Sequence, residues 1–189
     1  MKYLSLFLIL LTPLSAGPAK WKKDIAKFEA TDKKSPPPKG AYLFIGSSSA
    51  RMWDLKKYFP EYTTINRGFG GSELEDSLFY ADRILIPCQP KVVFLYAGDN
   101  DISNGKTAEI VTADFQKFVA KVHRALPKTD IVFVPIKPSL KRWSLWPKMN
   151  KANQAIKKIT EANPKLHYLP IPPTMLGKDG KPMNDLFVK

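Results

Sequence analysis

The sequence predicts an α/β fold in which one parallel sheet lies between layers of helices. Two observations predict it. Short apolar segments that end in glycine or polar residues alternate along the chain with amphipathic helical patterns, the arrangement of a doubly wound parallel sheet. The chain has 189 residues, of which 44% are hydrophobic, so one domain can bury its core without disulfides or structural metal.

The first segment, residues 1–16, has the pattern of a secretory signal peptide. Lys2 gives it a positive start, residues 3–14 are almost wholly apolar, and Ser15 and Ala16 supply small residues for cleavage. The apolar run is too short to span a bilayer comfortably. We therefore expect a secreted or periplasmic protein with no stable membrane insertion after cleavage, and an uncleaved membrane anchor is the alternative.

A leading helix and a linker are expected before the main domain. Residues 18–32 carry apolar side chains at helical spacing, namely Trp21, Ile25, Phe28 and Ala30. Three consecutive prolines make residues 33–40 a stiff linker. The remaining chain, residues 41–189, is expected to form the α/β domain.

Within residues 41–189 the strands and helices alternate. Apolar strands are expected at residues 42–45, 62–65, 92–96, 131–134 and 167–169. A helix begins at Ser72, where Glu75 completes a capping box. The stripes of this helix and of two later ones are Leu74, Leu78, Ala81 and Leu85; Val111, Phe115, Phe118 and Val122; and Met149, Ala152, Ile156 and Ile159. These elements predict a single three-layer α/β/α domain with a flavodoxin-like parallel sheet of about five strands.

The charge and cysteine content exclude several kinds of site. Lys and Arg number 30 against 17 Asp and Glu, a net charge of +13, but the lysines are scattered and no nucleic-acid-binding signature is present. We expect a solvated basic surface with some attraction for polyanions and no specific nucleic acid partner. The single cysteine, Cys88, is expected to be buried, and with only two histidines it makes no structural zinc site. No metal or organic cofactor is implied.

Small and polar residues follow four of the expected strands, at 46–49, 66–71, 98–101 and 137–139. Because the carboxyl ends of parallel strands share one edge of the sheet, these segments should meet in one crevice. A serine can act as nucleophile, glycines let backbone N–H groups approach a ligand, and an asparagine amide can donate to a developing oxyanion. Together they favour acyl transfer. Taken singly, they are also consistent with helix capping, a tight turn or phosphate cradle, and a hydrogen-bonded turn.

Three blocks stand in a characteristic order: Phe44-Ile-Gly-Ser-Ser-Ser49 followed by Trp53, then Ile65-Asn-Arg-Gly-Phe-Gly-Gly-Ser72, then Tyr96-Ala-Gly-Asp-Asn-Asp101. In order and spacing they resemble the SGNH hydrolases, also called the GDSL-type lipases and esterases. The stretch Pro135-Ile-Lys-Pro-Ser139 with Arg142-Trp143 is similar to a bacterial secreted subgroup. The resemblance implies a serine ester hydrolase acting on small acyl esters, with acetyl groups on polysaccharide as one expected substrate.

The resemblance also implies roles for individual residues. It places the nucleophile at Ser48, an oxyanion-hole glycine at Gly71 and an oxyanion-hole amide at Asn100, with the backbone N–H of Ser48 as the remaining donor. Ser49 is expected to cap the helix that follows. Asp99 is expected, like its neighbour Asp101, to structure the loop.

The family's last block, Asp-x-x-His, supplies the general base and the carboxylate that orients it. These 189 residues contain no such pair and end in Asp185-Leu-Phe-Val-Lys189. We therefore expect a C-terminally incomplete domain without its last helix and with impaired activity. Neither His123, in a long helix, nor His167, in the fifth strand, is expected to reach the serine. The alternative function is a non-catalytic module that binds an acyl or glycan ligand. No oligomeric state is predicted.

Overall fold

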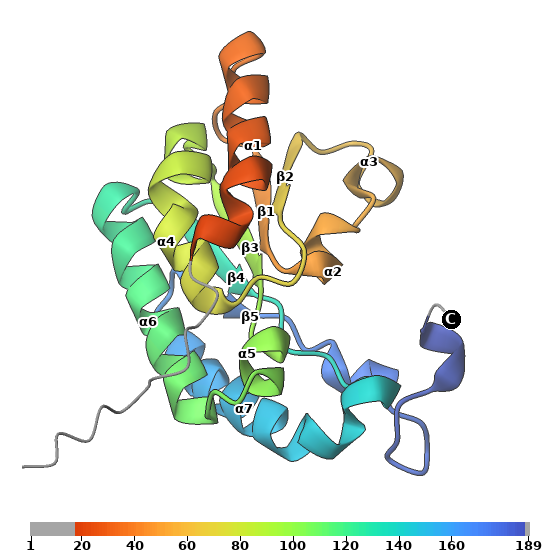
Figure 1. The fold of residues 1–189 in the computed structure, drawn as a ribbon. Coiled ribbons are helices and arrows are strands. Elements are labelled where there is room, and N and C mark those ends of the chain that lie inside the picture. The colour runs from red at the N-terminus through yellow and green to blue at the C-terminus, as the bar shows by residue number, and fades with distance from the viewer. Residues whose placement is uncertain (1–17, 188–189) are drawn as a thin grey trace, which may run out of the picture.

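Residues 18–187, which the computed structural model describes, form a parallel sheet of five strands in the order β2-β1-β3-β4-β5 (Figure 1). All neighbouring strands are parallel. The predicted α/β class and the flavodoxin-like order are confirmed, whereas the expected signal peptide lies outside the described residues. The strands are β1 Tyr42–Gly46, β2 Thr64–Gly68, β3 Val92–Tyr96, β4 Asp130–Phe133 and β5 Leu166–Tyr168.

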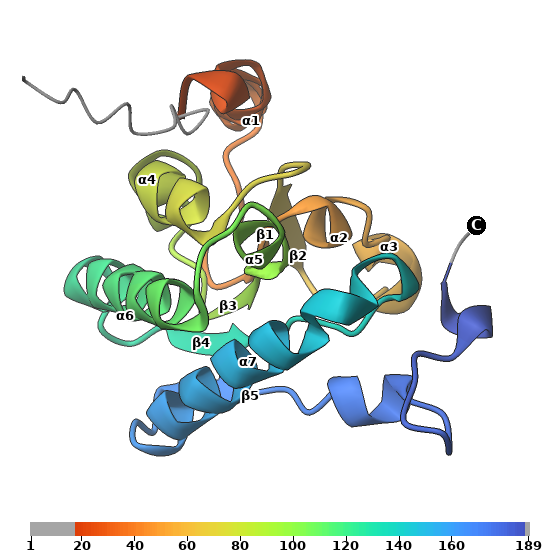
Figure 2. The same ribbon diagram turned by 60° about the horizontal axis from the view of Figure 1, so that its bottom comes forward.

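Four long helices cover one face of the sheet (Figure 2). They are α1 Lys22–Lys34, α4 Leu74–Ile84, α6 Ala108–Ala125 and α7 Trp146–Glu161. Their buried stripes pack against strand side chains that are closed to solvent, among them Leu43, Ile45, Val93, Leu95 and Phe133. The main core therefore lies on this side of the sheet.

Among the described helices, only short ones cover the opposite face of the sheet. The short helices α2 Ser48–Arg51 and α3 Leu55–Tyr58 lie there, and Ala50 packs against Tyr96 and Val134. Beside α3, a hollow of about 230 Å³ is lined by Tyr42, Phe44, Phe59, Tyr62 and Phe94. The remaining short elements are α5 Asp99–Ser103 and the 3-10 segments η2 Ile86–Cys88, η3 Leu140–Leu145, η4 Pro172–Met175 and η5 Asn184–Leu186.

The leading helix is longer than the expected 18–32. A 3-10 turn, η1 Pro18–Trp21, precedes α1, and α1 continues to Lys34. The first two residues of the expected linker 33–40 are therefore helical. Ile25 is fully buried where α1 packs on α4, which makes the leading helix part of the main core.

Strand β2 lies further along the chain than the expected 62–65. Its polar residues explain the difference. Asn66 donates to the carbonyl of Ala50 at 2.8 Å, and Arg67 is buried against α1. A sequence pattern assigns such side chains to a loop, whereas here each has hydrogen-bond partners inside the fold.

The start of α4 also differs from expectation. Its N-cap is Glu73, and Asp76 completes the capping box, in place of the expected Ser72 and Glu75. The Ser72 hydroxyl donates instead to a backbone carbonyl three residues earlier, at 2.9 Å. The box has therefore moved by one residue along the chain.

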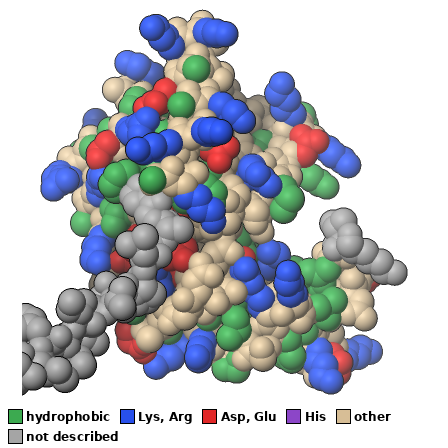
Figure 3. Space-filling view, in the orientation of Figure 1, with side chains coloured by type: hydrophobic (Ala, Val, Ile, Leu, Met, Phe, Trp, Pro, Cys, Tyr) green, Lys and Arg blue, Asp and Glu red, His purple; other side chains and the backbone are tan. Residues whose placement is uncertain are grey.

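Basic side chains are spread over the surface rather than gathered (Figure 3). Lys and Arg occur across the whole visible face, with acidic side chains among them. In the part of the chain that the structure describes, no helix is both long and apolar enough to cross a bilayer. Cys88 is a free, buried cysteine, as predicted.

Arg67 ties the edge strand β2 to the helical layer. The residue is 5% exposed, and its guanidinium pairs with Asp32 of α1. It also donates to the carbonyl of Ile84 at 3.1 Å, and its central carbon lies 5.0 Å from the centre of the Phe28 ring. One buried cation thus joins β2 to α1 and to the end of α4.

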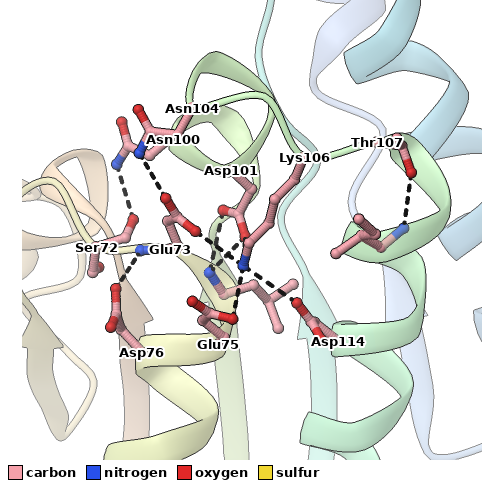
Figure 4. Close-up of polar contacts among 12 residues, drawn as sticks. Ser72, Glu73, Glu75, Asp76, Asn100, Asp101, Asn104, Lys106, Thr107 and Asp114 are labelled. Carbon is pink, nitrogen blue, oxygen red and sulfur yellow. Dashed lines mark hydrogen bonds and ion pairs between the residues drawn. The ribbon is translucent and has the colours of Figure 1, made fainter. Parts of the chain in front are cut away.

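Lys106, in the loop before α6, lies among four carboxylates (Figure 4). Its Nζ is 2.9 Å from Glu73, 3.0 Å from Glu75 and 3.5 Å from both Asp101 and Asp114. Burial raises the pKa of Asp101 to about 6. Burial opposes the charge of Lys106, but hydrogen bonds to Glu73 and Glu75 raise the pKa of this lysine overall. One ammonium therefore joins the start of α4 to α5 and α6.

Replacing Arg67 by Met is expected to lower the free energy of unfolding by about 3 kcal/mol, because the carboxylate of Asp32 and the carbonyl of Ile84 lose their partner in a mostly buried setting. Urea denaturation measures the change. The matched control is Arg83→Met, since Arg83 also pairs with a carboxylate of α1, Glu29, but with side chains 43% and 41% exposed. The control is expected to cost less than about 1 kcal/mol. Equal losses in the two variants would contradict the role of Arg67.

Replacing Lys106 by Met is expected to cost about 3 kcal/mol near pH 8 and clearly less near pH 5. Burial raises the folded-state pKa of Asp101 and the ammonium opposes this, so without Lys106 that pKa lies further above its unfolded value and stability is lost as the pH rises through it. Urea denaturation at the two pH values measures this.

The control for Lys106 is Lys117→Met, which removes a 64% exposed lysine from Asp114 alone. It is expected to cost less than about 1 kcal/mol at either pH. A deficit of Lys106→Met that does not change with pH would refute the carboxylate cluster as its cause.

Candidate active site

The three residues implied by the family resemblance lie after three neighbouring strands. Ser48 is the first residue of α2, after β1. Gly71 lies in the turn after β2, and Asn100 is the second residue of α5, after β3. Since β1 lies between β2 and β3, the three segments share one edge of the sheet. The three segments therefore lie at the edge of the sheet where the sequence predicts a crevice.

Two glycines allow α2 to sit close to the strands. A Cβ at Gly46 would stand 1.8 Å from the carbonyl oxygen of Tyr96, and one at Gly68 would stand 2.2 Å from the backbone nitrogen of Arg51. Neither position accepts any side chain. The connection between β1 and α2 is also held by a hydrogen bond from the Ser47 N–H to the same Tyr96 carbonyl at 2.9 Å.

Asn66 holds the other end of α2. Its amide nitrogen donates to the carbonyl of Ala50 at 2.8 Å and also reaches the carbonyl of Trp53 at 3.3 Å. Its side-chain oxygen accepts from the N–H of Gly68 at 2.9 Å. The short helix that carries Ser48 is thus fixed to β2 through one side chain.

Gly71 and Asn100 lie near each other because Asn100 bonds to the residue after Gly71. The Asn100 amide nitrogen donates to the Ser72 carbonyl at 2.9 Å (Figure 4). Gly71 has φ +77, a left-handed backbone that favours glycine. The Asn100 NH₂ group has two hydrogens and uses one on Ser72, so a second remains for a ligand.

Arg142, in η3, sets the orientation of the Asn100 amide. Its guanidinium donates to the side-chain oxygen of Asn100 at 3.0 Å and to Asp99 at 2.9 Å. The amide nitrogen of Asn100 is therefore directed away from Arg142 and toward Ser72. The sequence associates Arg142 with a subgroup of the family but contains no signal for this contact.

Asp99 and Asp101 structure the loop, as expected. Asp99 pairs with Arg142 and accepts from the Ser47 hydroxyl at 3.4 Å. Asp101 is fully buried and accepts from the backbone N–H of Leu74 at 3.1 Å, at the start of α4. Asp99 thus joins the segment after β3 to the segments after β1 and β4, and Asp101 joins it to the start of α4.

The three adjacent serines have different surroundings. Ser47 is buried and donates to Asp99. Ser48 is half-buried, and within residues 18–187 its hydroxyl makes no side-chain hydrogen bond in the structure. Ser49, expected to cap the helix, lies inside α2, and its Oγ accepts from Lys137 Nζ at 2.9 Å. The expectation for Ser49 is therefore wrong.

Lys137 follows β4 and lies beside a small cavity. Its Nζ is 2.9 Å from Ser49 Oγ and donates to the Tyr96 hydroxyl at 3.1 Å. Burial lowers the pKa of Lys137 and raises that of Tyr96. The cavity measures about 180 Å³, and its apolar wall is formed by Trp53, Val134, Pro135, Ile171 and Met175.

Both histidines lie away from this crevice, as expected. His123 Nε2 is 3.1 Å from the carbonyl of Thr129, and His167 Nε2 is 3.3 Å from the carboxylate of Asp130. Thr129 and Asp130 stand at the amino end of β4, opposite the edge that carries Ser48. In the described part of the chain, no cluster of His, Cys, Asp and Glu side chains could hold a metal ion.

Several solved structures share this fold. A Streptococcus pneumonia protein provisionally named a platelet activating factor has a TM-score of 0.80 and 21% identity, over 90% of this chain and 83% of that one. A GDSL-like lipase from Bacteroides thetaiotaomicron has a TM-score of 0.71 and 17% identity, over 92% and 86%. A catalytic mutant of an acetylxylan esterase from Geobacillus stearothermophilus has 0.56 and 15%, over 77% and 88%.

None of the curated proteins compared with the chain matches it. The model of the GDSL-like Lipase/Acylhydrolase family matches residues 46–188, starting at the last residue of β1. The matched region includes the second and third blocks and the first block from Gly46 on. The chain therefore belongs to the GDSL-like lipase and acylhydrolase family, a family of hydrolases.

Proposed function

We propose that the protein is a serine ester hydrolase whose nucleophile is Ser48 and whose substrates are small acyl esters. The proposal is supported by the positions of Ser48, Gly71 and Asn100, which follow three adjacent strands at one edge of the sheet, and by the bond from Asn100 to the residue after Gly71. Three hydrogen-bond donors are available for an oxyanion: the backbone N–H groups of Ser48 and Gly71 and the free amide hydrogen of Asn100.

In this mechanism the Ser48 hydroxyl attacks the ester carbonyl, and the three donors stabilise the negative charge that develops on the carbonyl oxygen. Asn100 needs no reorganisation at that moment, because Arg142 and the Ser72 carbonyl already hold its amide in place. The bond from the carbonyl carbon to the alcohol oxygen then breaks, and the alcohol leaves with the proton that the Ser48 hydroxyl has lost. Water next attacks the acyl-serine, which releases the acid and restores the hydroxyl.

A small acyl group, with acetyl as the leading candidate, matches the size of the cavity of about 180 Å³ beside α2, which is lined by Ser49, the neighbour of Ser48. The acetylxylan esterase of similar fold supports acetylated polysaccharide as a substrate class. Trp143 and Trp146 are stacked on each other, with ring centres 6.2 Å apart, so they favour packing over a sugar platform. Export through residues 1–16 would bring the enzyme to such substrates.

For the 189-residue chain, we expect turnover through Ser48 to be slow. Both histidine rings contact residues at the amino end of β4, and a serine without its histidine loses on the order of a millionfold in turnover. The same observation favours the second candidate, a module that binds acyl or glycan ligands. Binding of such a ligand without any hydrolysis would support that candidate.

The role of Ser48 is tested with a form of the chain that carries the family's Asp-x-x-His sequence after Lys189. Hydrolysis of p-nitrophenyl acetate by this form is expected to fall more than about a hundredfold in its Ser48→Ala variant, because the base then has no hydroxyl to activate. Ser35→Ala, at the exposed end of α1, is the control and is expected to keep the full rate. Equal rates with and without the Ser48 hydroxyl would contradict the proposal.

The oxyanion role of Asn100 is tested in the same form. Asn100→Ala is expected to lower kcat by about a hundredfold or more while KM changes little, because the donated hydrogen bond strengthens only in the transition state. Arg142→Met is expected to lower kcat by less, since the Asn100 amide remains but is free to rotate. A kcat unchanged in Asn100→Ala would exclude its amide from the oxyanion hole.

A further inference from the structure

Ser49, Lys137 and Tyr96 form a hydrogen-bonded group that the family assignment leaves without a role. The Lys137 amine contacts both hydroxyls, at 2.9 Å from Ser49 Oγ and 3.1 Å from the Tyr96 hydroxyl. The three residues come from α2, β3 and the segment after β4, and all three line the cavity of about 180 Å³. A serine, an amine in contact with it and a third group that orients the amine make up the arrangement of an activated nucleophile.

The surroundings of Lys137 favour a neutral amine. Among the described residues it makes no ion pair, because the carboxylate that faces it, Asp99 of α5, is held by Arg142 of η3 at 2.9 Å. Burial lowers the pKa of Lys137, the charge of Asp99 opposes this and the charge of Arg142 adds to it. The amine also contacts the hydroxyls of Ser49 and Tyr96 and lies 5.1 Å from the centre of the Tyr96 ring. Burial thus increases the fraction of Lys137 amine that is neutral, and able to accept a proton, relative to that of an ordinary lysine at the same pH.

We propose that Ser49 is a second nucleophile of the crevice, with Lys137 as its general base and Tyr96 as the residue that positions the amine. The acyl esters it would take are those of the proposed function, and only this substrate class rests on that proposal. The cavity wall formed by Trp53, Ile171 and Met175 would hold the acyl chain beside Ser49.

The reaction balances with these groups alone. The neutral amine of Lys137 accepts the proton of the Ser49 hydroxyl as Oγ forms a bond to the carbonyl carbon. The bond from that carbon to the alcohol oxygen then breaks, and the alcohol leaves with the proton from Lys137. Water later attacks the acyl-serine through the same amine, which releases the acid and restores the hydroxyl.

A fluorophosphonate, which transfers its phosphonyl group to an activated serine with loss of HF, tests the proposal on the 189-residue chain as it stands. Trypsin releases residues 40–51 as one peptide that contains Ser47, Ser48 and Ser49, and fragmentation of this peptide assigns the labelled serine. We expect the label on Ser49, its loss in Ser49→Ala and its retention in Ser48→Ala.

Lys137 variants separate a general base from a structural role. Labelling is expected to slow by about a hundredfold in both Lys137→Met and Lys137→Arg, because a guanidinium keeps the positive charge but does not accept a proton. Lys141→Met, an exposed lysine of η3, is the control and is expected to label at the full rate. Thermal unfolding checks that each variant is folded. If Lys137→Met does not fold, Lys137→Arg still provides the test.

The pH dependence gives a second measurement. The labelling rate of the wild-type chain and of Ser48→Ala is expected to rise through the pKa of Lys137, which burial holds below that of an ordinary lysine. Lys137→Arg is expected to show no rise over that range.

Each remaining outcome decides between the proposals. A label on Ser48 that is unaffected by Ser49→Ala and Lys137→Arg would overturn the dyad and leave the proposed function standing. A label on Ser49 that is retained in Lys137→Arg would overturn Lys137 as the base. An unlabelled wild-type chain would also overturn the dyad, whereas Ser48 is judged separately by the form that carries Asp-x-x-His.

Discussion

The close approach of Gly46 to the backbone of Tyr96 determines where every serine of the crevice lies. Any side chain at Gly46 would collide with the Tyr96 carbonyl, and the Ser47 N–H donates to the same oxygen. The start of α2 is therefore held against the end of β3. From this position Ser47 reaches Asp99 and Ser49 reaches Lys137, while Ser48 remains half-buried without a side-chain partner in the described structure.

The buried cations of the fold divide into two kinds. Arg67 and Lys106 are paired with carboxylates and join helices to strands or to one another. Among residues 18–187, Lys137 makes no ion pair and donates to the hydroxyls of Ser49 and Tyr96, because Arg142 already pairs with the carboxylate of Asp99. A paired cation stabilises its neighbours in its charged form, whereas an unpaired one is held closer to its neutral form by burial. The partners of Lys106 therefore suit it to hold helices together, whereas the partners of Lys137 suit it to accept a proton.

Much of the fold could be predicted from the sequence because its signal is local. Residues 92–96 are apolar throughout, and the strand is found at those positions. Strand β2 was harder to predict because Asn66 and Arg67 are polar, and their partners lie 16 and 35 residues away along the chain. Periodicity identifies a buried face only when the buried side chains are apolar.

The candidate active site also shows that local sequence patterns miss contacts between distant residues. Ser48, Gly71 and Asn100 were singled out by the family resemblance, whereas the sequence pattern alone predicted only that the segments after the strands meet at one edge. Lys137 and Arg142 also follow a strand, but Lys137 reaches a serine 88 residues earlier, and no local pattern encodes that contact. A sequence pattern does not distinguish three consecutive serines. In the described structure the Ser47 hydroxyl contacts a carboxylate, the Ser49 hydroxyl contacts an amine and the Ser48 hydroxyl has no side-chain partner. Their chemistry is therefore set by the segments that follow β3 and β4, not by their own neighbours in the chain.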